Sequence, residues 1–205
     1  MKKALIISGV VFVCLACMFG ALKHFGPSDA IILTPEEEKA EEERLTASFE
    51  DADLSGFSTV TVTGNAISSD IFKNYKITMI NLWVTSCSPC IEEMPDLGKL
   101  YHELPEGSTI ISICLDTAGD KDAVKFAAKV MSDSKADFMT LVPDEALKGK
   151  LGDITTEYPT TIFVDSTGKT VGAPHFGGRT ADDYKQAILD RMAILQGDSS
   201  EETSE

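Results

Sequence analysis

The hydrophobic and polar positions of residues 54–197 follow two alternating patterns, which together predict an α/β domain. Ile77–Thr85 and Thr109–Leu115 are short, mostly apolar runs rich in β-branched side chains, as expected of strands buried on both faces of a sheet. Pro95 is expected to kink the segment between them. In that segment apolar side chains recur at helical spacing, at Ile91, Met94, Leu97, Leu100, Tyr101 and Leu104. Two buried strands joined by a helix predict a right-handed βαβ unit.

Further segments extend this unit on both sides. Phe57–Val62 and Ala66–Phe72 predict an N-terminal β-hairpin. A second helix is expected to begin after Asp120, which can cap it. The apolar face of this helix holds Val124, Ala127, Ala128 and Met131.

The C-terminal part of the domain predicts a hairpin followed by a helix. Thr161–Val164 and Lys169–Val171 flank a turn in which Gly168 stands where a positive φ is needed. Thr180 can cap the last helix, with Asp183 at its third position. The apolar face of this helix holds Tyr184, Ile188, Met192 and Leu195. The order of elements is two strands, then β-α-β-α, a further strand, and β-β-α, which predicts a mixed central sheet with helices on both faces.

The N-terminal segment, residues 1–24, has the features of a membrane anchor or a lipoprotein signal. Ala4–Leu22 comprises nineteen residues without a charge, and a helix of that length is close to the roughly 30 Å thickness of the hydrocarbon layer. Three interpretations remain open: an uncleaved anchor, a lipoprotein signal with Cys17 as the acceptor, or a cleaved secretory signal. All three place the rest of the chain on the extracytoplasmic side of the cell membrane.

Charge is concentrated outside the predicted domain. The chain has 33 acidic and 18 basic residues, for a net charge of −15. Residues 25–53 predict an acidic spacer, in which a helix can run from Pro35 to about Phe49 but has too little apolar surface to pack. Residues 198–205 predict a disordered acidic tail. The acidic excess excludes a nucleic-acid binder that works by neutralising phosphates.

Cys87-Ser88-Pro89-Cys90 stands where a buried strand is expected to turn into a helix. Unpaired N–H groups and the helix dipole would stabilise a thiolate at Cys87, and Pro89 suits the first turn. Cys90, one turn further in, could then resolve a mixed disulfide. A structural disulfide and a zinc half-site are the alternatives, and a zinc site would need further ligands. The pattern favours thiol–disulfide exchange and requires neither a metal nor another cofactor.

A longer pattern surrounds the two cysteines and extends to Pro95. Its form is Asn-x-Trp-x-x-x-Cys-x-x-Cys-x-x-Glu-x-Pro, met here by Asn81, Trp83, Cys87, Cys90, Glu93 and Pro95. In this pattern the chain resembles the membrane-anchored thioredoxin-like proteins of the TlpA and ResA type, over roughly residues 57–195 and including the anchor. The resemblance implies a thioredoxin-like fold and thiol–disulfide exchange outside the membrane. Cytoplasmic thioredoxins differ, since they carry Trp where Ser86 stands and a buried Asp at the position of Asn81.

The same resemblance implies roles for residues around the cysteines. Tyr158-Pro159-Thr160-Thr161 is similar to the cis-proline loop of the family, so Pro159 is expected to be cis and the Tyr158 backbone to pair with an extended substrate. Glu93 is implied as the acid–base group that replaces the buried Asp of thioredoxin, whereas Glu92 is expected to be solvated.

Three other side chains have simpler expected roles. Trp83 is expected to pack beneath the active site. Cys114, in a buried strand, is expected to be an inert thiol. His175 is expected to lie on a loop without a role.

The predicted function is that of a membrane-tethered disulfide reductase, with a disulfide-bearing client and a membrane thiol donor as partners. The client stays open between apocytochrome c, as in cytochrome c maturation, a methionine sulfoxide reductase, a spore-coat protein and general reduction. A peroxidase of the peroxiredoxin type would place Thr or Ser where Val84 stands. A metal- or haem-delivery protein with a thioredoxin-like fold would carry three residues between its cysteines and a distal His.

Overall fold

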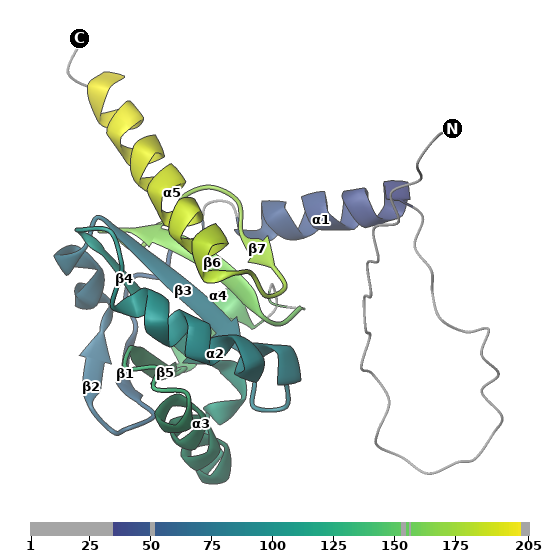
Figure 1. Ribbon diagram of the computed structural model, residues 1–205, viewed down its shortest axis with the longest axis vertical. Helices are drawn as coiled ribbons and strands as arrows, with labels where there is room; N and C mark the ends of the chain where they lie inside the picture. The colour runs from purple at the N-terminus through teal and green to yellow at the C-terminus, as the bar shows by residue number, and fades with distance from the viewer. Residues whose placement is uncertain (1–34, 50–51, 153–154, 156, 202–205) are drawn as a thin grey trace, which may run out of the picture.

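The computed structural model describes residues 35–49, 52–152, 155 and 157–201. Their centre is a seven-stranded mixed sheet with the strand order β2-β1-β5-β4-β3-β6-β7 (Figure 1). The strands are β1 (Ser58–Thr61), β2 (Ala66–Ser68), β3 (Ile77–Trp83), β4 (Ser108–Cys114), β5 (Met139–Val142), β6 (Thr160–Asp165) and β7 (His175–Phe176). The α-helices are α1 (Pro35–Phe49), α2 (Ser88–Tyr101), α3 (Lys121–Asp133), α4 (Glu145–Leu151) and α5 (Ala181–Glu201).

The predicted βαβ unit forms the middle of the sheet. β3 and β4 are parallel and joined by α2, and β5 extends the parallel part beyond β4. β6 pairs antiparallel with β3 on the other side, and β1 pairs antiparallel with β5. Every residue of β3 and of β4 is buried, which explains why both read as nearly continuous apolar runs. The predicted α/β fold with a mixed sheet is therefore confirmed.

Alternation along β3 divides its side chains between two hydrophobic clusters, one on each face of the sheet. Ile77, Met79 and Trp83 belong to the cluster that is covered by α2, α3 and α5, the helices nearest the viewer in Figure 1. Ile80 and Leu82 belong to the opposite cluster, which is covered in part by α4. The same alternation places Asn81 on the α2 side, so that one polar side chain stands within that face.

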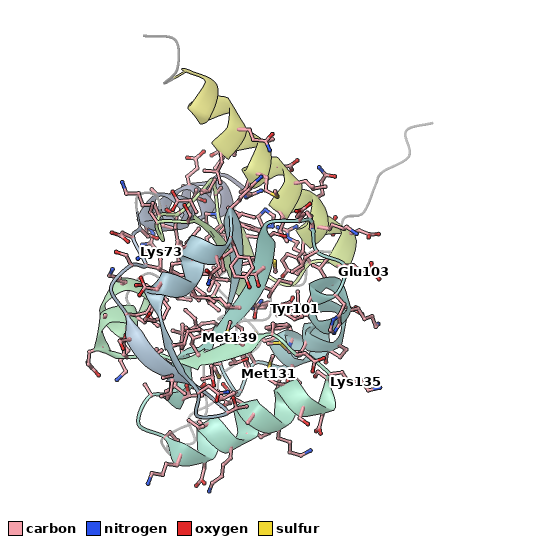
Figure 2. The ribbon with its side chains drawn as sticks, turned by 90° about the vertical axis from the view of Figure 1, so that its left-hand side faces the viewer. Lys73, Tyr101, Glu103, Met131, Lys135 and Met139 are labelled. Carbon is pink, nitrogen blue, oxygen red and sulfur yellow. A yellow bond between two sulfur atoms is a disulfide. The ribbon has the colours of Figure 1, made fainter. Side chains whose placement is uncertain are left out.

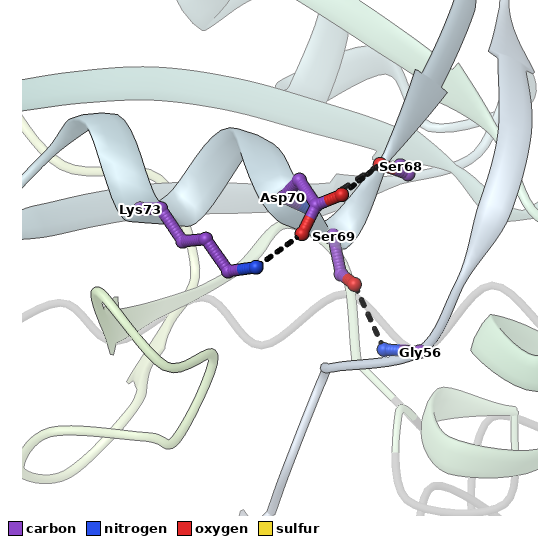
Figure 3. Close-up of polar contacts among 5 residues, drawn as sticks. All are labelled: Gly56, Ser68, Ser69, Asp70 and Lys73. Carbon is purple, nitrogen blue, oxygen red and sulfur yellow. Dashed lines mark hydrogen bonds and ion pairs between the residues drawn. The ribbon is translucent and has the colours of Figure 1, made fainter.

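The second predicted N-terminal strand is shorter than expected. β2 ends at Ser68, and a 3-10 helix follows over Ser69–Asn74, so the prediction of a strand up to Phe72 was wrong. Local polar contacts favour the turn (Figure 3): Ser69 Oγ accepts from the N–H of Gly56 at 2.9 Å, and Lys73 pairs with Asp70 at 2.6 Å. The 3-10 helix still buries Phe72. Beside it lies a polar hollow of about 480 Å³, lined by Ser55, Ser69, Asp70, Lys73, Ser166 and Thr167.

The C-terminal hairpin also differs from the prediction. Gly168 has the expected positive φ of 93° in the turn after β6. Lys169–Val171, however, forms no regular strand and makes isolated bridges, between Thr170 and Val164 and between Lys169 and Asp53. The strand that pairs with the other edge of β6, away from β3, is β7, where His175 lies opposite Thr161. The expectation of His175 on a loop was therefore wrong. The short helix α4 was not predicted either.

α2 is shorter than predicted, and its C-terminal half packs closely against the segment that follows α3. The predicted helix reached Leu104, but α2 ends at Tyr101. In Figure 2, Tyr101 lies within the fold while Lys135 lies at its periphery, and the Tyr101 ring packs on Phe138 with 5.9 Å between centroids. Gly98 allows this close approach, because a Cβ there would lie 2.8 Å from the carbonyl oxygen of Lys135.

Both ends of the described chain depart from the predicted spacer and tail. α1 has the predicted extent, but Phe49 is only 2% exposed and its ring packs against Phe176 at 6.3 Å. Residue Thr170 donates to the carbonyl oxygen of Phe49 at 2.9 Å, so packing begins inside the segment expected to be a solvated spacer. α5 continues to Glu201, where a disordered tail was expected from residue 198.

The predicted anchor, with Cys17, lies in residues 1–34 and thus outside the described residues. Within the described ranges, no helix has the length and the apolar character needed to cross a membrane.

Candidate active site

Cys87 and Cys90 form a disulfide at the N-terminus of α2, with 5.3 Å between their Cα atoms. Cys87 is the N-cap residue, and its sulfur accepts from the N–H of Cys90 at 3.3 Å. Pro89 occupies the first turn of the helix, as expected of a residue without an N–H group. The chain turns from the buried strand β3 into α2. Both sulfurs therefore lie at the N-terminal end of α2, where the helix dipole is positive.

The two cysteines differ in their exposure to solvent. Cys87 is partly exposed, and its neighbours Ser88 and Pro89 are exposed. Cys90 is 0% exposed and belongs to the hydrophobic cluster beneath α2. A partner protein can therefore reach Cys87 but not Cys90, which is the asymmetry that an attacking and a resolving thiol require.

Glu93 lies one helical turn after Cys90, on the same buried face of α2, and is 9% exposed. Its carboxyl accepts from Asn81 Nδ2 at 2.7 Å on Oε1 and from the hydroxyl of Tyr184 at 3.0 Å on Oε2. Burial raises the pKa of Glu93, while these two bonds and one from the main-chain N–H of Arg179 lower it, and burial is the largest effect. Glu92 is exposed, as expected.

The peptide bond between Tyr158 and Pro159 is cis, as the resemblance implied. The register of the sheet places this bond beside the cysteines, because Leu82 of β3 lies opposite Thr160 of β6. Gly178 links the loop to Glu93: a Cβ at Gly178 would lie 3.1 Å from Glu93 Oε2 and 4.0 Å from Pro159 Cγ. Tyr158 is half-buried and packs against the same cluster as Cys87. Burial, with a smaller contribution from Asp116, raises the pKa of its hydroxyl.

Trp83 and Cys114 support the site from below. Trp83 is 0% exposed, and its Nε1 donates to Ser112 Oγ at 3.3 Å. Cys114 lies opposite Trp83 in the parallel pair of strands and is also 0% exposed. Burial is the largest cause that raises the pKa of the Cys114 thiol, which keeps it protonated and unreactive.

Two side chains of the site were not identified from the sequence. Asp116 accepts from the N–H of Thr85 at 2.9 Å on Oδ2 and from the Cys114 thiol at 3.2 Å on Oδ1, so it braces the turn that precedes Cys87. Tyr184 was predicted only as a core residue of the last helix. Its hydroxyl could have indicated a polar contact within the core, because a buried Tyr O–H usually finds a hydrogen-bond partner.

The described part of the chain contains no group of three His, Cys, Asp or Glu side chains placed to hold a metal ion. His175, in the edge strand β7, has a cation rather than metal ligands as its neighbour. Its Nε2 lies 3.2 Å from the guanidinium of Arg191, and burial, followed by the charges of Arg191 and Arg179, lowers the pKa of His175.

A thioredoxin-like sheet, a Cys-x-x-Cys disulfide at a helix N-terminus and an adjacent cis-proline define the class of thiol–disulfide oxidoreductases. A model of the AhpC/TSA family matches residues 50–172. Because this match covers more than half of the chain, the protein belongs to the AhpC/TSA family.

Individual relatives share the thioredoxin-like fold. The chain is 26% identical to the thioredoxin-like protein YneN of Bacillus subtilis (strain 168) over 134 residues, which are 64% of this chain and 74% of that protein. A thiol:disulfide interchange protein of Chlorobium tepidum TLS superposes with a TM-score of 0.58 at 22% identity, covering 70% of this chain and 97% of the other. StoA of Bacillus subtilis superposes with a TM-score of 0.53 at 19% identity, covering 66% and 97%. These two structural similarities concern the fold.

Proposed function

We propose that the protein is an extracytoplasmic, membrane-tethered disulfide reductase of the TlpA and ResA type. One observation carries this proposal: the Cys87–Cys90 disulfide joins a partly exposed cysteine at the N-terminus of α2 to a fully buried one. The uncharged segment Ala4–Leu22 supports the tether. The acidic character of the chain argues against nucleic acid as a partner.

The proposed reaction is a dithiol–disulfide exchange in two steps. The Cys87 thiolate attacks one sulfur of a client disulfide, which forms a mixed disulfide and releases the other client sulfur as a thiolate. Cys90 then attacks Cys87 Sγ, which forms the Cys87–Cys90 disulfide and releases the second client thiolate. Two electrons pass to the client, and a membrane dithiol donor returns two electrons to the protein. Glu93, one turn from Cys90, accepts the proton of the Cys90 thiol as that sulfur becomes a nucleophile.

The client is proposed to bind along the cis-proline loop. The backbone of Tyr158 precedes β6 at the end of the sheet where Cys87 lies, so an extended client segment can pair with it. Because main-chain groups make such a contact, it suits clients that differ in side chains but share an extended disulfide-bearing segment.

The decisive experiment traps the mixed disulfide. In Cys90→Ala, Cys87 still attacks a client disulfide but no second thiol resolves the intermediate, so covalent complexes accumulate on non-reducing gels. Replacing Cys87 as well abolishes them. Cys114→Ala is the matched control: its thiol is buried and protonated, and adding this change to Cys90→Ala leaves the complexes intact. Absence of Cys87-dependent complexes would remove the main support for the exchange reaction.

The direction of electron flow follows from the reduction potential of the pair. Known Cys-x-x-Cys proteins span about −270 to −120 mV. A potential below about −220 mV fits a reductant, whereas a potential near −120 mV would show that the protein oxidises its clients.

The alternatives differ from this proposal in simple assays. A peroxidase would consume hydroperoxide with Cys87 as the attacking thiol, but Val84 places no hydroxyl where that chemistry uses Thr or Ser. A metal- or haem-delivery protein would bind copper or haem in the reduced state. Hydroperoxide consumption and copper titration of the reduced protein test the two alternatives directly.

A further inference from the structure

Four polar side chains from four elements meet inside the apolar layer between the sheet and its covering helices. Asn81 and Thr161 lie directly opposite each other on β3 and β6, Glu93 comes from α2, and Tyr184 comes from the first turns of α5. Asn81, Thr161 and Tyr184 are each 0% exposed. A cluster of this kind is costly to bury unless its members satisfy one another.

The hydrogen bonds of this cluster converge on the carboxyl of Glu93. Asn81 Nδ2 donates to Oε1 at 2.7 Å, and the Tyr184 hydroxyl donates to Oε2 at 3.0 Å. The main-chain N–H of Arg179 is the third donor. None of the three donors carries a charge, so the carboxyl is held in place without an ion pair. Along its own helix, the nearest redox-active groups are Cys87 and Cys90.

The hydrogen bond from Tyr184 differs from the bonds that Asn81 and Arg179 donate to Glu93. Asn81 sits on β3, the strand that leads into the cysteines, whereas Tyr184 reaches the site from a helix and lies 91 residues after Glu93 in the chain. Its hydroxyl has one short bond, to Glu93, and a longer one of 3.5 Å from Thr161 Oγ1. Core packing alone would be served equally well by Phe, so the hydroxyl has a purpose that the ring does not explain.

Resting on the proposed exchange reaction, we propose that Tyr184 is a positioning residue of the redox site, whose hydroxyl holds Glu93 in the orientation and proton affinity needed to serve Cys90. The bond to Oε2 limits rotation of the carboxyl about its last torsion. It also favours the ionised carboxyl, because a hydroxyl donor binds a carboxylate more strongly than a neutral acid. Loss of the hydroxyl would leave Glu93 less well oriented and more readily protonated.

Tyr184→Phe tests this proposal, because it removes the hydroxyl and keeps the ring. The midpoint of the Glu93 titration is followed by NMR of protein labelled with ¹³C at the Glu side-chain carboxyl, and Glu93→Gln identifies the signal. We expect the midpoint to rise by about one pH unit, since a hydrogen bond to a charged group changes a protonation equilibrium about tenfold or more. Tyr101→Phe, the same chemical change at the far end of α2, should leave the midpoint in place.

Exchange kinetics supply the second measurement. The pH profile for release of the Cys87–client mixed disulfide should move upward by a similar amount in Tyr184→Phe. In a Glu93→Gln background the same change should shift nothing, because the group that Tyr184 positions is then absent. A lower melting temperature with an unchanged Glu93 midpoint and pH profile would overturn the proposal and leave Tyr184 as a packing residue.

An opposite perturbation keeps the proposal testable if Tyr184→Phe does not fold. Tyr184→3-fluorotyrosine preserves the ring and makes the hydroxyl a stronger donor, so the Glu93 midpoint should fall. A midpoint that stays or rises would contradict the proposed role. The NMR titration does not depend on client turnover, so failure of the Cys90→Ala trap with a shifted midpoint would refute the exchange reaction but not the Tyr184–Glu93 coupling.

Discussion

Replacing Glu93 by Gln should make the folded protein more stable at neutral pH while making it a poorer catalyst. Glu93 is 9% exposed, and burial is the largest effect on the pKa of its carboxyl, which is raised above the ordinary value of 4.5. Gln has nearly the same shape and needs no burial of a charge. Its oxygen can accept from Asn81, and its amide can donate to the Tyr184 hydroxyl, which can in turn rotate toward Thr161 at 3.5 Å.

The pH dependence of this effect has a definite sign. The folded state binds the proton of Glu93 more tightly than the unfolded state, because the folded pKa is raised. Below the unfolded pKa both states are protonated, and the stabilising contribution of the neutral carboxyl is fully present. As the pH rises through the folded pKa this contribution is lost, since the free energy of unfolding falls wherever the folded state binds more protons.

The magnitude follows from the pKa difference between the two states. Each unit by which the folded pKa exceeds the unfolded one lowers the free energy of unfolding at neutral pH by about 1.4 kcal/mol. Glu93→Gln removes this loss, and for a domain of this size each kcal/mol raises the melting temperature by about 2–4 °C. At a pH below the unfolded pKa, the two proteins should have nearly the same stability.

Thermal and denaturant unfolding of the oxidised proteins at pH 4 and pH 7.5 measure this difference. Glu92→Gln is the matched control, because that neighbouring side chain is exposed and the change should have little effect at either pH. In proteins that keep Cys90, release of the Cys87–client mixed disulfide by Cys90 should slow in Glu93→Gln only, since Gln cannot accept the thiol proton. A Glu93→Gln protein that is less stable than the native protein at pH 7.5, with equal stabilities at pH 4, would refute the reasoning and indicate a carboxylate that its three donors stabilise.

Two glycines and one phenylalanine provide further predictions. Gly98→Ala should lower the free energy of unfolding by about 1–3 kcal/mol, because its Cβ would lie 2.8 Å from the carbonyl oxygen of Lys135. Gly149→Ala in α4, where a Cβ meets no atom within 4 Å, should raise it by about 1 kcal/mol, and equal unfolding midpoints for the two variants would contradict both assignments. Phe49→Ala should cost about 3 kcal/mol in denaturant unfolding, because Phe49 is 2% exposed. An unchanged midpoint would mean that α1 does not contribute to the folded domain.

The local features of the redox motif were readable from the sequence. The mostly apolar run of β3 indicated burial on both faces, and the position of Cys87 before the following helix placed it at the helix N-terminus. Both follow from short-range rules of periodicity and helix capping, which act over a few residues and do not depend on the rest of the fold. The cap box of α5 is a similar case: Asp183 N–H donates to Thr180 Oγ1 at 3.2 Å, as its spacing predicted.

Contacts between distant segments were decided by the tertiary structure. Phe49 could not be recognised as a core residue, because α1 is mostly polar and the Phe49 ring meets Phe176 only when β7 is paired with β6. The strand position of His175 also escaped prediction, since a two-residue strand carries too little periodicity to be detected. The tail differs too, because α5 continues to Glu201 beyond the apolar face that marked its expected end.

The surroundings of Glu93 combine one feature set by local sequence with several set by tertiary packing. The position of Glu93 one turn after Cys90 could be predicted from the sequence, because helical spacing alone sets that relation. It did not determine that Asn81, Tyr184 and the N–H of Arg179 surround the same carboxyl. Those groups lie 12 and more residues away in sequence and meet only because β3, α2 and α5 pack around one buried layer. The physical reason is that a side chain's proton affinity depends on its burial and its donors, and both are properties of the assembled fold.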